Sequence, residues 1–87
     1  MARKMYMISV RWKSDSRADD LQKKLPGSWL RFNTHLWLLK SESLSSEVFD
    51  KIDTELLEID DIIIMEVDPD TRYGWAETWI WDWIDKP

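Results

Sequence analysis

Apolar and polar side chains alternate along residues 5–13, close to the N-terminus. One face carries Tyr6, Ile8, Val10 and Trp12, and the other carries Met5, Met7, Ser9, Arg11 and Lys13. A period of two with one firmly apolar face predicts a strand that lies on a core. The Ser-Asp-Ser sequence at 14–16 breaks this pattern and offers caps for a helix.

A short amphipathic helix is predicted next, because Ala18, Leu21 and Leu25 recur at helical spacing. Pro26-Gly27 ends it. Alternation then resumes over 29–32 and again over 36–39, with Asn33-Thr34 between them. Since asparagine tolerates the left-handed region of a turn, the two segments predict a hairpin.

The second predicted helix covers 44–57, where the spacing of the apolar residues is again helical. Ser45 is its expected N-cap, with Leu44 and Phe49 as a hydrophobic staple and Glu47 placed well in the first turn. The β-branched run at 62–67, bounded by aspartates on both sides, predicts a fourth strand.

The order βαββαβ predicts one α+β domain over residues 1–87, a ferredoxin-like sandwich with two helices on one face of a four-stranded antiparallel sheet. The other face would then be open. The residues expected there, subject to register, are Met5, Met7, Trp29, Trp37 and Met65. Because a monomer rarely leaves such a patch in water, either the C-terminal tail or a second chain should cover it.

The tail, residues 75–87, is tryptophan-rich and fits two patterns. As a helix it stacks Trp75, Trp79 and Trp83 on one side; as a strand it gathers those three and Trp81 on one face. The helix is slightly favoured. Both patterns predict a docking segment, since free tryptophans at this density would aggregate.

Composition restricts the class of protein. The chain has 87 residues, seven tryptophans and no cysteine, so packing rather than disulfides or thiolate metal sites must stabilise it. No apolar run is long enough to cross a bilayer, and the first residues do not form a secretion signal, so a cytoplasmic protein without membrane contact is expected. Residues 1–40 carry a net charge of +6 and residues 41–87 a net charge of −11. Two solvated helix faces, one basic and one acidic, are the favoured explanation, over a charged partner or self-association.

Several short motifs together resemble the SinR-like family, which is similar to the small CRISPR-associated proteins that accompany the spacer integrase and to VapD-like ribonucleases. The motifs are residues 37–45, WLLKSESLS, the opening 5–10, MYMISV, the aspartate-rich lead into 62–67, and the tryptophan-rich end. The resemblance implies a ferredoxin-like fold and a homodimer built partly through the sheet and the C-terminal segment.

The chain departs from this family at one important position. Members with nuclease activity carry an aspartate in a Tyr-Asp pair after the first apolar run, where two subunits are thought to hold a divalent metal. Here the pair is Val10-Arg11, and a guanidinium cannot ligate Mg²⁺. Asp15 would replace the lost ligand only if the strand ended early.

Other candidate chemistry is sparse. His35 stands without a second histidine or a cysteine, so a structural role is favoured over catalysis or zinc binding. The aspartates at 60–61 and 68–70 lack the spacing of a calcium loop. No phosphate-binding glycine motif is present, and no cofactor is expected.

These observations lead to a non-catalytic, dimeric module that acts by protein association, with nucleic acid as a less favoured partner. The expected interaction residues are Trp75, Trp79, Trp81 and Trp83, with Trp37 and Trp29; possible phosphate contacts are Arg11, Lys13 and Arg17. Two alternatives stay open: a metal-dependent endoribonuclease, and an acidic mimic of nucleic acid that inhibits a defence protein.

Overall fold

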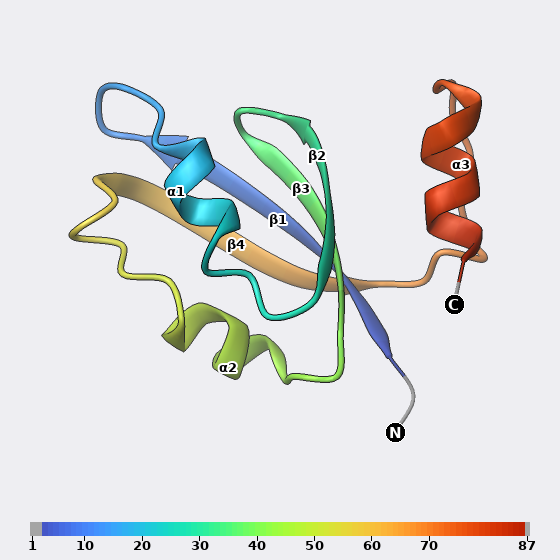
Figure 1. The fold of residues 1–87 in the computed structure, drawn as a ribbon, viewed down its shortest axis with the longest axis horizontal. Coiled ribbons are helices and arrows are strands. Elements are labelled where there is room, and N and C mark those ends of the chain that lie inside the picture. The colour runs from blue at the N-terminus through green and yellow to red at the C-terminus, as the bar shows by residue number, and fades with distance from the viewer. Residues whose placement is uncertain (1–2, 87) are drawn as a thin grey trace.

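The computed structural model describes residues 3–86 of this α+β chain. Four strands and three helices follow one another in the described residues (Figure 1). Their bounds are β1 Lys4–Trp12, α1 Ala18–Gln22, β2 Ser28–Asn33, β3 Leu36–Ser41, α2 Ser45–Asp50, β4 Ile59–Val67 and α3 Thr78–Asp85. The strands form one antiparallel sheet, as the alternation of residues predicted.

The sheet has the strand order β2-β3-β1-β4, so β1 is paired on both sides. Residues directly opposite one another in paired strands share a face. Tyr6 lies opposite Leu39 and Glu66, whereas Met7 lies opposite Leu38 and Met65. The even-numbered residues of β1 therefore share a face with the odd-numbered residues of β3.

The core lies on the face that carries Tyr6, Ile8, Val10 and Trp12. These four residues belong to one buried cluster with Trp37 and Leu39 of β3, Ala18 and Leu21 of α1, and Val48 of α2. Two of its polar groups bond to backbone: the Tyr6 hydroxyl donates to the Ser43 carbonyl at 2.6 Å, and Trp12 Nε1 donates to the Thr34 carbonyl at 2.7 Å. The cluster thus ties both helices and the hairpin turn to the central strand.

The expectation that Trp37 and Trp29 face the open side of the sheet is wrong. Trp37 is opposite Ile8 and fully buried in the core. Trp29 is opposite Leu39, so it points to the core side at the edge of the sheet and stays 38% exposed. Because β3 is apolar at both odd and even positions, alternation alone did not decide which set faces inward.

The second helix is much shorter than predicted, ending at Asp50 instead of extending to residue 57. Leu44 rather than Ser45 occupies the cap position, where its N–H donates to the Glu47 carboxylate at 2.7 Å. Leu44 and Phe49, the expected staple, are both about half exposed. The chain after α2 forms turns, yet Ile52 and Leu57 are buried, so these apolar residues keep a helix-like spacing without a helix.

Gly27 allows β2 and β3 to approach closely where the first helix returns to the sheet. Its φ is +153°, and a Cβ atom there would lie 2.1 Å from the Lys40 carbonyl oxygen. That distance is far below van der Waals contact, so no other residue fits without moving β3. The same corner is fixed by Ser41, whose hydroxyl donates to the Pro26 carbonyl at 2.5 Å.

Within the tail, residues 78–85 form the helix α3, which begins after Trp75, so Trp75 is not part of the predicted helical stack. This helix lies on the opposite side of the sheet from α1 and α2 (Figure 1). Met5, Leu30 and Lys40 are buried, although the register places all three on the face away from the core cluster. Ile63 and Met65 of β4, on the same face, are each 55% exposed. The C-terminal segment therefore covers the part of this face that carries Met5, Leu30 and Lys40, and leaves Ile63 and Met65 of β4 exposed. None of the helices within residues 3–86 has the length and apolar character needed to span a membrane.

A buried and an exposed tryptophan should respond very differently to substitution by alanine. Trp37→Ala should lower the free energy of unfolding by about 3–5 kcal/mol, because it removes a fully buried ring from the core. Trp75→Ala, which truncates a side chain that is 99% exposed, should change it by no more than about 0.5 kcal/mol. Urea denaturation followed by far-ultraviolet circular dichroism measures both, and equal losses would contradict the placement of Trp37.

The C-terminal segment and its docking on the sheet

A compact turn directs the chain away from β4 at the start of the C-terminal segment, residues 68–86. The Asp68 carboxylate accepts the Asp70 N–H at 2.9 Å, and the Asp68 carbonyl accepts both the Thr71 N–H and its hydroxyl. Pro69 lies within this turn, where its fixed φ is easily accommodated. The aspartates at 68 and 70 thus have a structural role here.

Arg72, in the linker that follows this turn, connects the linker to α3. Its guanidinium lies 2.6 Å from the Asp85 carboxylate and 5.3 Å from the centre of the Trp81 ring. The hydrogen bond with Asp85 raises the pKa of the Arg72 guanidinium, which therefore stays charged. Linker and helix are held together as one segment by these contacts.

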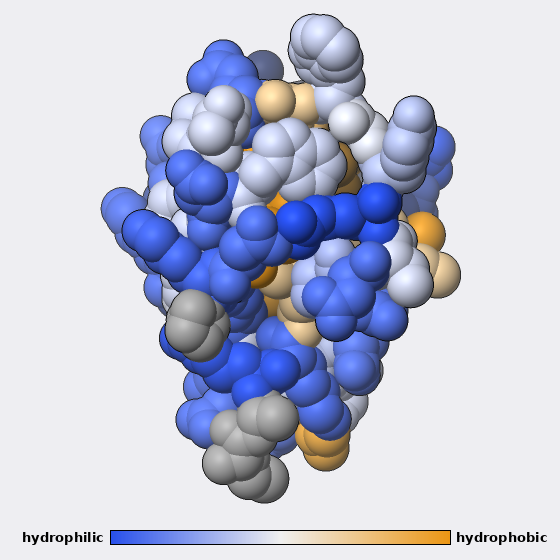
Figure 2. Space-filling model, turned by 90° about the vertical axis from the view of Figure 1, so that its right-hand side faces the viewer, coloured by the Kyte–Doolittle hydropathy of each residue, from blue (hydrophilic) through white to orange (hydrophobic). Residues whose placement is uncertain are grey.

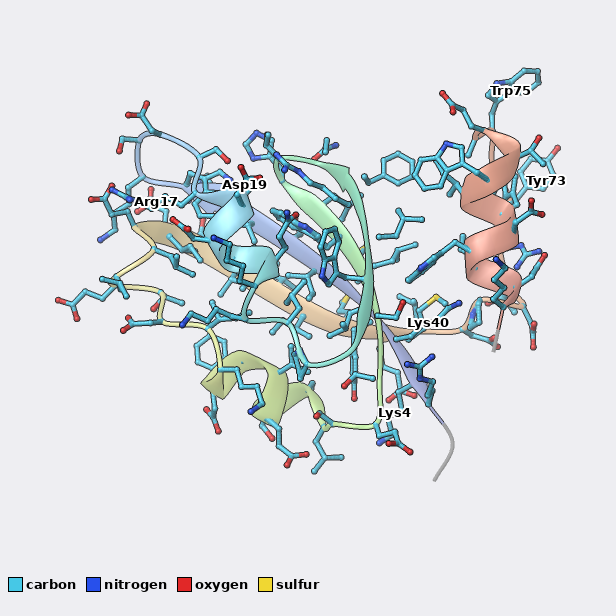
Figure 3. All side chains as sticks on the ribbon, viewed as in Figure 1. Lys4, Arg17, Asp19, Lys40, Tyr73 and Trp75 are labelled. Atoms are coloured by element: carbon cyan, nitrogen blue, oxygen red, sulfur yellow. The ribbon has the colours of Figure 1, made fainter. Side chains whose placement is uncertain are left out.

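Lys40 of β3 holds the C-terminal end of α3 to the sheet (Figure 3). Its ammonium donates to the carbonyls of Trp83 and Lys86, and it lies 4.2 Å from the centre of the Trp83 ring. The last carbonyls of a helix lack partners within the helix and carry partial negative charge, so a lysine satisfies them well. Lys40 is only 6% exposed, which makes this an interior contact of the protein.

Burial is the main reason why the pKa of Lys40 is lowered, and the nearby positive charges of Arg3 and Lys86 lower it further. Asp85 acts in the opposite direction. The ammonium is thus surrounded by carbonyl oxygens and an aromatic ring while two other cations lie close to it. The position where the tail meets the sheet is consequently rich in positive charge.

The tryptophans of the tail fall into two groups. Trp81 and Trp83 are half-buried, in contact with Arg72 and Lys40 respectively. Trp75 is 99% exposed and Trp79 is 54% exposed, with the Trp79 indole nitrogen donating to the Glu77 carboxylate at 2.7 Å. Trp75, together with the fully exposed Tyr73 in the linker, points away from the sheet (Figure 3).

The view onto this side of the molecule is mostly hydrophilic or near neutral in hydropathy, with apolar atoms in gaps at the centre and at the right and lower edges (Figure 2). This distribution fits a segment that has already covered most of the apolar sheet face beneath it. The exposed aromatic residues of this segment are Tyr73, Trp75 and Trp79.

Two of the three residues suggested as phosphate contacts are engaged in ion pairs. Arg11 pairs with Asp61 across β1 and β4, and Arg17 lies 3.4 Å from Glu58. Lys13, at the end of β1, is exposed. The structure does not bring these three residues together around a shared pocket, and the carboxylates beside Arg11 and Arg17 would weaken contact with phosphate.

The residues considered for metal or acid–base chemistry are also dispersed. Asp15 lies exposed in the loop after β1, and no group of three or more histidine, cysteine, aspartate or glutamate residues gathers at a metal-binding distance within residues 3–86. His35 lies in the hairpin turn, where its Nδ1 is 3.2 Å from the Val10 carbonyl and its backbone carbonyl accepts the Val10 N–H. This arrangement is structural.

Sequence reasoning missed Lys40, Arg72 and Asp85, which position the tail. A signal existed for Lys40, since it is a charge at the end of the apolar run 36–39 within a predicted strand. Arg72 and Asp85 gave no such signal, because their pairing requires the linker to fold back along α3.

Lys40→Met tests whether the ammonium holds α3 in place. Methionine keeps an unbranched apolar stem but cannot donate to the two carbonyls, so amide protection over residues 78–85 should fall by about tenfold or more. Hydrogen–deuterium exchange measures this, and Lys51→Met, at the exposed end of α2, is the matched control. Unchanged protection would show that packing of the stem, and not the ammonium, holds the helix.

The lowered pKa of Lys40 also predicts how stability depends on pH. Between the lowered pKa and the ordinary value of 10.5, the unfolded chain binds more protons than the folded one, so the free energy of unfolding should rise with pH. Below the lowered pKa, Lys40 is protonated in both states, so its contribution to the free energy of unfolding no longer changes with pH. Urea titrations at a series of alkaline pH values give the free energy of unfolding of the wild type and of Lys40→Met. The wild-type value minus the variant value should grow with rising pH, and a decrease would contradict the prediction.

Comparison of the chain with family models, with curated proteins and with solved structures finds no match. The resemblance to SinR-like proteins therefore stays a prediction from short motifs.

Proposed function

We propose that the chain is a non-catalytic association module that forms a homodimer through its C-terminal segment. A ferredoxin-like fold is part of this proposal. It is supported by the element order of the first 67 residues and by the strand order β2-β3-β1-β4, in which the two hairpin strands lie to one side of β1 and the last strand to the other.

The observation that carries the proposal is the exposure of Tyr73 and Trp75. Both side chains lie fully in water, although each could bury roughly 200 Å² at an interface. Large aromatic residues on a pre-positioned segment are the residue types that dominate binding energy when a partner covers them. Since Lys40 and Arg72 already hold the segment, little ordering entropy would be lost on binding.

A second copy of the chain is the proposed partner because of the area that is available. Tyr73 and Trp75 together supply roughly 400 Å², against the approximately 800 Å² per partner of a stable interface. Trp79 and the uncovered Ile63 and Met65 of β4 provide further apolar area. In an isologous dimer each of these residues is used twice, so one set of anchors serves both copies.

Neither alternative has a comparable observation in its favour. Metal-dependent cleavage of RNA would depend on Asp15, which is exposed in a loop and has no acidic cluster around it in the part of the chain that the structure describes. The mimic of nucleic acid would depend on the acidic second half, but Asp61, Glu58 and Asp85 are engaged with arginines of the same chain.

The double substitution Tyr73→Ser/Trp75→Ser tests the proposal. Sedimentation equilibrium of the wild type should show a monomer–dimer equilibrium, and the variant should weaken dimerisation by about tenfold or more, the loss expected for interface anchors. Leu56→Ser, which changes an apolar side chain that is 67% exposed elsewhere, is the control and should leave the equilibrium unchanged. A wild type that stays monomeric at high concentration, or a variant that dimerises equally well, would refute the proposal.

A further inference from the structure

We propose that the hollow between the start of β1, the ends of β3 and β4, and the C-terminal end of α3 binds a small organic anion, namely a monocarboxylate with an apolar body. The hollow has a volume of about 760 Å³, within the range of small-molecule sites. The inference goes beyond the proposed association, because it concerns a different surface from that of Tyr73 and Trp75.

The charges around this hollow favour an anion. Four cations line it, Arg3, Lys4, Lys40 and Lys86, against two carboxylates, Glu66 and Asp68. The cations come from three separate segments: the pairing of β1 with β3 brings Lys4 near Lys40, and the folding of α3 onto the sheet adds Lys86. Such a concentration of like charge raises the free energy of the empty site, and a bound anion would offset it.

The pKa of Lys40 agrees with this arrangement of charges. Besides its burial, the positive charges of Arg3 and Lys86 disfavour its ammonium, so the three cations lie close enough to repel one another. A carboxylate in the hollow would favour the charged form of Lys40 instead. Because Lys40 also holds the carbonyls at the end of α3, the same ligand would strengthen the docking of the helix.

The remaining lining explains why the ligand should have an apolar body. Met5, Val67, Pro69 and Ile84 line the hollow between the charged groups, and Met5 is 8% exposed. A fully apolar ligand would leave the excess cations desolvated, at a cost in free energy. A polyphosphate would meet the carboxylates of Glu66 and Asp68. A single carboxylate on a short aliphatic or aromatic body satisfies both kinds of lining.

Hexanoate is a suitable probe of the full chain, with acetate, hexanol, hexylamine and inorganic phosphate as comparison ligands. Hexanoate should bind saturably and shift the methyl resonances of Met5, Val67 and Ile84 in nuclear magnetic resonance spectra. It should also change the fluorescence of Trp83, whose ring lies against Lys40; a Trp83→Phe variant identifies that signal. Acetate and hexanol should each bind at least about tenfold more weakly, since each lacks one of the two features, and hexylamine should not compete.

Charge reversal at Lys86 separates a specific site from general attraction. Lys86→Glu should weaken hexanoate binding by about tenfold or more, whereas Lys51→Glu, at the end of α2, makes the same change in net charge and should have no effect. Binding without saturation, equal binding of hexylamine or phosphate, or a Lys86→Glu variant that binds as wild type would overturn the inference. The Tyr73→Ser/Trp75→Ser variant should bind hexanoate normally, so failure of the dimer and failure of this site are distinguishable.

Discussion

The ammonium of Lys40 is the contact on which the arrangement of this protein's second sheet face depends. A lysine at the end of β3 points away from the core and, when covered, must find partners or lose its charge. The C-terminal end of α3 supplies two carbonyl oxygens and an aromatic ring in one place. The tail is thereby drawn onto the sheet, the carbonyls at its end are satisfied, and a cluster of cations forms where β1, β3 and the tail meet.

The distribution of the seven tryptophans follows from this division of the sheet. Trp12 and Trp37 stabilise the core between the sheet and the first two helices, and Trp81 and Trp83 are half-buried where the tail folds back. Trp29 lies at the edge of the sheet on the core side, partly exposed, and Trp75 and Trp79 are left on the outside. Aromatic area that neither face of the sheet uses is the physical basis for proposing an association surface, and the cationic hollow beneath the tail is a separate feature with its own chemistry.

Much of the local structure could be predicted, and the failures have identifiable causes. Alternation placed β1 and the hairpin correctly to within a few residues, and helical spacing identified α1. The same spacing over 44–57 overstated α2, because the turns that follow it also send Ile52 and Leu57 into the core; the left-handed Glu58, at φ 55°, precedes β4. The predicted start of β4 at residue 62 is too late, because β4 begins at Ile59 and Asp61 lies inside the sheet, where it pairs with Arg11. Of the candidate interaction residues, the exposed Trp75 and Trp79 could be named in advance, while the contacts that position them could not.

The order of the elements, the inward face of β1 and the apolar character of the tail follow from local patterns, because periodicities of two and 3.6 residues are visible in any short segment. Which face of β3 is buried depends on tertiary pairing: Leu36 and Leu38 share one face, Trp37 and Leu39 share the other, and pairing with Ile8 and Tyr6 turns the second pair inward. Tertiary contacts also give α3 a side that faces the rest of the protein and a side that faces water. That outcome required Lys40, Arg72 and Asp85, which lie up to 45 residues apart in the chain, to meet around one helix end. Contacts of this range are fixed by packing and electrostatics in three dimensions, and no local pattern records them.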